Sequence, residues 1–125
     1  MIVDTDVLIW YMKGNKKALT EIEKLPGFYI SVVTWIELLQ GMRNKKELSC
    51  LRRAMAEWQA NVLYINEEIS SRAAAYIERH FLSHKLHLAD SLIAATGAIH
   101  NMLVLTGNHR HFSVIKDVRV VPFRA

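Results

Sequence analysis

A few acidic residues stand where they could act together on a metal ion. The chain has only four aspartates, and Asp4 and Asp6 directly follow a short apolar run at residues 1–3. Asp90 stands near the start of a helical pattern, and Glu37 falls in the first turn of another predicted helix. Hard oxygen ligands without accompanying Cys or His pairs favour Mg²⁺ or Mn²⁺ over zinc. Such a metal suits phosphodiester hydrolysis, because it activates water and neutralises charge in the transition state.

The acids need a fold that brings them together, and the chain alternates β-rich runs with helical patterns. Five strands are expected, at residues 1–3, 28–33, 62–65, 102–105 and 118–123. This alternation predicts right-handed crossovers and a mainly parallel sheet covered by helices on both faces. Ligands of such sheets bind at the carboxyl ends of the strands. We therefore expect one α/β domain over residues 1–125, a three-layer sandwich with the acids and Thr106 on one rim.

Each acid also has a purely structural explanation. Asp4 suits a turn, Asp6 suits a local cap, and Asp90 suits the positive end of a helix. For Glu37 the explanation is specific, because residues 34–37 match the S/T-x-x-E capping box, in which Glu37 bonds the Thr34 backbone N–H. Convergence on one rim favours a functional interpretation. Carboxylates about 4 Å apart repel by about 4 kcal/mol at an effective dielectric of about 20, and a bound cation removes that repulsion.

The composition excludes several classes of protein. Hydrophobic residues make up 51% of the chain and charged residues 22%, which indicates a globular rather than a disordered protein. The net charge of +4 weakly favours a polyanionic partner. No apolar run approaches the about 20 residues of a membrane helix, and no basic segment of a signal peptide is present. We expect a cytoplasmic protein without membrane contact, whose single cysteine, Cys50, is a buried structural thiol.

Four blocks of the sequence together resemble the PIN-domain family. In chain order they are IVDTDVLI at 2–9, S-x-x-T-x-x-E-L at 31–38, LADSLIAA at 88–95 and LTGN-x-x-x-F at 105–112. The chain length is similar to that of the VapC-type toxins of prokaryotic toxin–antitoxin pairs. The resemblance implies a five-stranded sheet in the order 3-2-1-4-5. It also implies a Mg²⁺- or Mn²⁺-dependent endoribonuclease that cleaves single-stranded RNA and inhibits translation.

The resemblance assigns roles to individual residues as well. The places of the family's metal-binding and catalytic acids are taken by Asp4, Glu37 and Asp90. Supporting positions match Thr5, Asp6 and Thr106. The family's fourth acidic position is Asn108 here, whose carbonyl oxygen can bind a metal but brings no charge. A tightly held second metal is therefore in doubt. The implied partners are RNA, a cognate antitoxin and a second copy of the chain.

Other polar and aromatic residues have more than one interpretation. His109, Arg110 and His111 either contact RNA phosphates or form a solvated loop, and His84 and His87 are expected to be exposed loop residues rather than ligands. The aromatic residues expected to pack between the first strand and its neighbouring helices are Trp10, Tyr11 and Trp35. Part of that apolar surface is expected to bind the antitoxin or a second copy.

Other functions fit the sequence less well. Haloacid-dehalogenase-like phosphatases also begin with Asp-x-Asp, but they need Thr or Val where Leu8 stands, and a later Asp pair that is absent. Response-regulator receivers need an Asp at the end of the third strand, where this chain has Ile65 and Asn66. The remaining alternative is a PIN-like module that binds RNA or protein without cleavage, because Asn108 replaces an acid. Metal-dependent RNA cleavage that is lost in EDTA separates the two.

Overall fold

The expected parallel sheet is present in a computed structural model that describes residues 1–82 and 86–125. The strands are β1 (Ile2–Val3), β2 (Tyr29–Ser31), β3 (Asn61–Leu63), β4 (Val104–Thr106) and β5 (Val120–Pro122). All neighbouring strands pair in parallel, in the order β3-β2-β1-β4-β5. The predicted fold class and strand order are therefore confirmed. The predicted loop at 83–85, which includes His84, lies outside the described residues.

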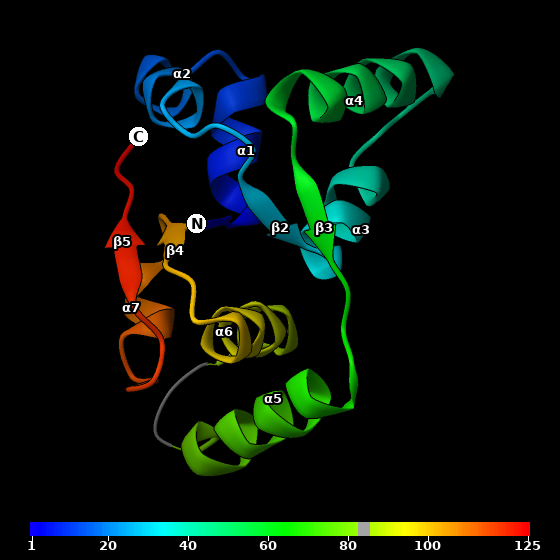
Figure 1. Cartoon of the computed structure of the whole chain (residues 1–125). Helices are drawn as coiled ribbons and strands as arrows, with labels where there is room; N and C mark the ends of the chain where they lie inside the picture. Colours follow the sequence, from blue (N-terminus) through cyan, green and yellow to red (C-terminus); the bar gives the residue numbers. More distant parts are fainter. Residues whose placement is uncertain (83–85) are drawn as a thin grey trace.

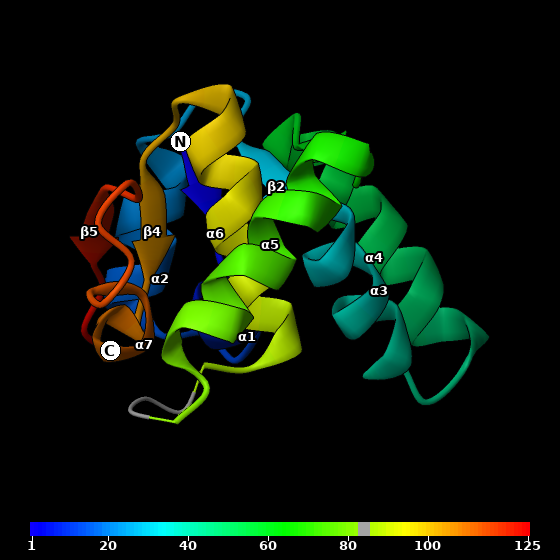
Figure 2. The same ribbon diagram turned by 90° about the horizontal axis from the view of Figure 1, so that it is seen from below.

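Helices cover both faces of the sheet. Among the described residues they are α1 (Thr5–Met12), α2 (Lys16–Glu23), α3 (Val32–Gln40), α4 (Lys45–Trp58), α5 (Glu67–His80), α6 (Leu88–His100) and α7 (His109–Phe112). Figure 1 shows α1, α2 and α4 on one side of the sheet and α5 and α6 on the other. Figure 2 views the molecule from the side of α5 and α6, which lie across that face.

The two faces of the sheet carry two separate hydrophobic cores. In the central strand β1, Val3 joins a core with residues of α1, α2 and α4, whereas Ile2 joins a core with residues of α5, α6 and α7. Leu105 and Val104 of β4 divide between the two cores in the same way. Successive side chains of a strand point to opposite faces, so burial of both faces produces the continuous apolar runs of the sequence.

Helix α1 is an element that the hydrophobic pattern did not predict. It starts at Thr5, immediately after β1, and Asp4 is its N-cap residue. Its apolar residues include the buried Val7 and Leu8 but also the exposed Ile9. An apolar segment without a single buried stripe lacks the periodicity by which a helix is recognised.

The start of α3 corrects the interpretation of Glu37. The predicted strand at 28–33 ends at Ser31, whose hydroxyl accepts a hydrogen bond from the Val33 backbone N–H at 3.1 Å. Ser31 rather than Thr34 is therefore the N-cap residue, and the capping-box interpretation is wrong. Glu37 lies in the second turn of α3, not in the first, and its side chain is free to serve another contact.

Surface exposure differs from expectation at two other points. Cys50 is exposed, because α4 directs Leu51 and Trp58 into the core and leaves Cys50 beside them at the surface. The third strand ends at Leu63, and the following Tyr64 is 69% exposed. In the described part of the chain, no helix is both long and apolar enough to cross a membrane.

Candidate active site at the carboxyl rim of the sheet

Asp4 and Thr106 join the ends of two neighbouring strands. Asp4 follows β1, and Thr106 is the last residue of β4. The Thr106 hydroxyl donates to Asp4 Oδ2 at 2.6 Å, and the Thr5 backbone N–H donates to Asp4 Oδ1 at 2.8 Å. The Thr106 hydroxyl in turn accepts from the Asn108 backbone N–H at 2.9 Å. Both oxygens of the Asp4 carboxylate thus accept hydrogen bonds at the rim. The contact with Thr106 is possible because β1 and β4 are neighbouring strands, as expected.

The environment of the Asp4 carboxyl group disfavours its ionised form. Burial, together with the nearby charges of Asp6 and Asp90, raises its pKa to about 7, although the hydrogen bonds from Thr106 and Thr5 act in the opposite direction. The side chain is only 4% exposed, so water does little to offset the charge. The described residues around Asp4 therefore provide no positive charge to balance its ionised form.

Glu37 reaches the same rim through a hydroxyl group. The Thr5 hydroxyl donates to Glu37 Oε1 at 2.7 Å and lies 3.0 Å from the Thr34 hydroxyl. Thr5 follows Asp4 directly, so this bond brings the Glu37 carboxylate next to the Asp4 segment. Glu37 itself is exposed to solvent.

Asp6 holds the turn that follows β4. Its Oδ2 accepts from the Gly107 backbone N–H at 3.0 Å. A Cβ atom at Gly107 would collide with this carboxylate, so only glycine allows the approach. The second oxygen, Oδ1, is buried and has no hydrogen-bond partner among the described residues. Burial raises the pKa of Asp6, and the charge of Asp90 acts in the same direction. The contact agrees with a supporting position for Asp6.

Asp90 comes to the rim from the first turn of α6, and it has an unexpected partner. It is 9% exposed, and its Oδ2 lies 3.2 Å from His111 Nδ1 of α7. The ring of His87, the residue before α6, meets the His111 ring edge-on with centroids 5.9 Å apart. Neither of the two sequence interpretations of His111 included this contact. No local signal reveals it, since residues 90 and 111 belong to different elements.

The other polar residues after β4 make fewer hydrogen bonds through their side chains. Asn108 precedes α7, but its side chain makes no capping hydrogen bond, and its role as a metal ligand stays a prediction. His109 Nδ1 is buried, and no residue that the structure describes forms a hydrogen bond with it. Arg110 is exposed, which leaves it able to meet an RNA phosphate.

The acids do not form a ready-made metal site in this conformation. Among the described residues, no group of three or more His, Cys, Asp or Glu side chains is arranged to hold a metal ion. That Asp4, Glu37 and Asp90 bind one shared ion stays a prediction. The donor chemistry still suits Mg²⁺ or Mn²⁺, because the rim offers carboxylate oxygens, one of them buried without a partner, and an excess of negative charge. The metal-binding roles remain predictions.

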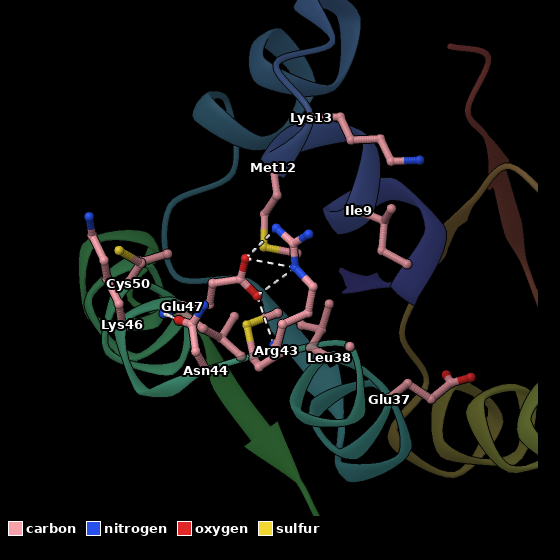
Figure 3. A pocket seen from close by; sticks show the side chains of 14 residues that line it. Ile9, Met12, Lys13, Glu37, Leu38, Arg43, Asn44, Lys46, Glu47 and Cys50 are labelled. Carbon is pink, nitrogen blue, oxygen red and sulfur yellow. Dashed lines mark hydrogen bonds and ion pairs between the residues drawn. The ribbon is translucent and has the colours of Figure 1, made fainter.

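A groove lies beside this rim. Its volume is about 850 Å³, and residues of α1, α3 and α4 form its walls. Apolar side chains line it, including Met12, Leu38 and Leu51, and Glu37 lies at one side, whereas the Arg43–Glu47 ion pair crosses it (Figure 3). Because Glu37 is one of the lining residues, the groove extends to the candidate site.

Of the three aromatic residues expected to pack beside the first strand, two pack against the core and one is exposed. Tyr11 and Trp35 pack against the core under α1 and α4, and the Tyr11 ring meets Trp58 edge-on at 5.2 Å. Trp10 is instead 41% exposed, with Lys13 Nζ 5.5 Å from its ring centroid. None of the expected three lines the groove.

Known relatives identify the family. Residues 1–118 match the PIN domain. The chain is 32% identical over 123 residues to ribonuclease VapC10 of Mycobacterium tuberculosis, which covers 95% of this chain and 90% of that protein. It is 30% identical over 118 residues to ribonuclease VapC1 of Methanocaldococcus jannaschii, covering 94% of this chain and 82% of that protein.

Solved structures agree with these relatives. A toxin–antitoxin complex from Klebsiella pneumoniae contains a similar chain with a TM-score of 0.79 and 31% identity, covering 99% of this chain and 98% of that one. VapBC-1 from nontypeable Haemophilus influenzae gives a TM-score of 0.82 at 24% identity, covering 97% and 96%, and supports the fold alone. This chain therefore belongs to the PIN-domain family, among relatives of the VapC type.

Proposed function

We propose that this protein is a Mg²⁺- or Mn²⁺-dependent endoribonuclease that cleaves single-stranded RNA in the cytoplasm and acts as the toxin of a type II toxin–antitoxin system. One observation carries the metal dependence: Asp4 is buried beside other acids, and its pKa is raised to about 7. RNA phosphates alone would add negative charge to this rim, so binding RNA there requires a cation. The curated relatives are ribonucleases, which supports the activity.

The chain's own residues would prepare the site for this reaction. Thr106 and the Thr5 backbone orient the two oxygens of Asp4, and the Thr5 hydroxyl holds Glu37 beside them. Asp4, Glu37 and Asp90 would hold the ion through carboxylate oxygens. When bound, the ion would activate water and neutralise charge on the scissile phosphate. Asn108 would contribute at most a neutral oxygen.

Cleavage of a fluorescent single-stranded RNA tests the proposal. We expect cleavage in Mg²⁺ or Mn²⁺, loss of cleavage in EDTA and recovery when excess metal is added. Asp90→Asn should lose at least about 100-fold in activity while it retains the native circular dichroism spectrum. Cleavage that persists in EDTA would contradict the metal dependence. RNA binding without cleavage under all metal conditions would favour the non-cleaving alternative.

The groove is our proposed antitoxin site. Its apolar lining suits an apolar segment of a partner, and Lys13 and Lys46 at the same groove favour acidic residues in that segment. Because Glu37 also lines the groove, a partner seated there would lie against the candidate active site. A toxin–antitoxin complex among the structural relatives supports an antitoxin as the partner.

Neutralisation in cells tests the groove. Met12 is 42% exposed and lines it, so Met12→Glu should retain RNA cleavage and toxicity but escape a co-expressed antitoxin. Leu103→Glu is the matched control, because Leu103 is 36% exposed but does not line the groove. The single cysteine, Cys50, gives a second measurement, since it lines the groove and the antitoxin should protect it from a maleimide. Equal neutralisation of both variants, with Cys50 unprotected, would place the antitoxin elsewhere.

We also propose that two copies of the chain associate. Ile36 on α3 is 49% exposed and Tyr64 after β3 is 69% exposed, which leaves apolar surface next to the sheet edge formed by β3. Sedimentation velocity is expected to show a dimer of the native chain and a monomer of Tyr64→Glu. A monomeric native chain at micromolar concentration would contradict the dimer.

A further inference from the structure

The contact between His111 and Asp90 has a defined direction. An ionised carboxylate has no proton to give, so His111 Nδ1, at 3.2 Å from Asp90 Oδ2, is the donor. Asp90 is 9% exposed, and this is the only side-chain hydrogen bond of its carboxylate among the described residues. One oxygen of Asp90 is thereby held, and Oδ1 is left for another ligand.

The His111 ring is itself held in place from two sides. The next residue, Phe112, is fully buried in the core that also contains Ile93 of α6, which fixes α7 against α6. The His111 backbone N–H donates to the Asn108 carbonyl oxygen at 2.9 Å. On its outer side, the ring meets the edge of His87. A ring restrained in this way can fix the orientation of the carboxylate that it contacts.

We propose that His111 is a positioning residue for Asp90: its Nδ1–H holds one carboxylate oxygen, which would leave the other free to bind the metal ion. This inference rests on the proposed metal-dependent function. Loss of the donor would let the Asp90 carboxylate rotate, and part of the metal's binding free energy would then be spent on ordering it. His111 does not contact RNA in this role, and its effect on cleavage passes through metal binding.

Two substitutions of His111 separate the effect of its hydrogen bond from that of the packing of its ring. His111→Phe keeps an aromatic ring against His87 but removes the donor. His111→Asn removes the ring but places an amide N–H near the position of Nδ1. His100→Ala, an exposed histidine at the opposite end of α6, is the matched control. Together with His111→Ala they distinguish positioning from mere structural support.

Direct Mn²⁺ titration of the metal-free protein, by electron paramagnetic resonance at one fixed alkaline pH, is the decisive measurement. His111→Ala and His111→Phe should bind Mn²⁺ about 10-fold more weakly than the native chain. His111→Asn and His100→Ala should bind it within about 2-fold of the native chain. In cleavage assays, the Mn²⁺ concentration for half-maximal rate should rise in step for the first two variants, with little change of kcat at saturating Mn²⁺.

Several outcomes would overturn the inference. Unchanged Mn²⁺ affinity in His111→Phe would show that the hydrogen bond has no positioning role, and tighter affinity would show that His111 competes with the metal. An Asn variant as weak as the Phe variant would also contradict it. If His111→Ala does not fold, the Phe and Asn variants still decide the question. Failure of the proposed function looks different: the native chain would bind no Mn²⁺, or Asp90→Asn would bind it equally well.

Discussion

Asp4 and Asp117 are the same kind of side chain in opposite electrostatic environments. Asp117 accepts hydrogen bonds from the Tyr76 hydroxyl at 2.7 Å and from Arg72 at 3.0 Å. Burial alone would raise the pKa of Asp117, but these hydrogen bonds and the Arg72 charge hold it below its usual value. In the described part of the chain, Asp4 has only neutral donors and acidic neighbours, and its pKa is raised to about 7.

The difference separates a structural acid from a candidate functional one. Asp117 has its counter-charge within the chain, and its bonds tie α5 to the segment before β5. Around Asp4 the described residues gather negative charge without a cation, which costs stability unless a ligand supplies positive charge. The raised pKa of Asp4, and not merely the presence of an acid, supports the rim as the candidate active site.

The largest expected effect is on activity, when the same substitution is made in the two regions. Asp4→Asn should reduce RNA cleavage by at least about 100-fold, because it removes a ligand charge, and stability should hold or rise because repulsion with Asp6 and Asp90 is relieved. Asp117→Asn should keep its activity but lose about 1 kcal/mol of stability. Cleavage assays and urea unfolding measure the two quantities. Loss of folding in Asp4→Asn would instead assign Asp4 a structural role.

The two acids should also give stability opposite pH dependence. The folded pKa of Asp4, about 7, lies above its unfolded value, so the folded state binds more protons and stability falls as pH rises between about 4 and 7. The loss is on the order of 4 kcal/mol in the metal-free protein, and Mg²⁺ or Mn²⁺ should reverse it. The folded pKa of Asp117 is depressed, so its contribution is present above the unfolded pKa and is lost as pH falls through the folded value.

Thermal unfolding at several pH values checks this sign. Asp4→Asn should flatten the decline in stability between about pH 4 and 7, whereas Asp117→Asn should leave that decline in place. A native chain whose metal-free stability rises over this interval would show that Asp4 is ionised without penalty.

A smaller effect is expected from adding charge to the candidate site. Asn108→Asp should tighten metal binding in the absence of RNA by about 10-fold and lower the Mn²⁺ concentration for half-maximal cleavage. Calorimetric and kinetic titrations of both forms measure this. If neither quantity changes, Asn108 lies outside the coordination sphere; if binding tightens while the maximal rate falls, Asn108 instead orients the attacking water.

The smallest effect is expected in the structural region. Tyr76→Phe removes one hydrogen bond to Asp117 and should lower the free energy of unfolding by about 1 kcal/mol. The pKa of Tyr76 is raised to about 12, first by burial and then by this bond, so the phenol remains a donor at neutral pH. RNA cleavage should not change. A loss of cleavage in a folded Tyr76→Phe variant would break the division between the two regions.

Patterns that are local in the chain predicted an α/β domain with a mainly parallel sheet, and the resemblance of four sequence blocks to the PIN-domain family implied the order of the strands. Alternating strand and helix patterns allow few topologies, and β-α-β handedness then brings the carboxyl ends of β1 and β4 to one rim. Asp4, Asp6 and Thr106 could be placed there without coordinates. The same local reasoning failed at α1, which has no buried stripe, and at Thr34, where Ser31 offers a competing cap.

Only the tertiary structure decided which side chains meet. Thr106 and Asp4 are 102 residues apart in the chain, Glu37 and Thr5 are 32 apart, and His111 and Asp90 are 21 apart. Such contacts depend on how helices pack on the sheet and on the rotamers that packing allows, and neither is encoded in local periodicity. The groove between α1, α3 and α4 and the exposure of Cys50 have the same origin. Chain connectivity could place the acids on one rim, but packing decided that Asp117 has a cationic partner and that Asp4 has none among the described residues.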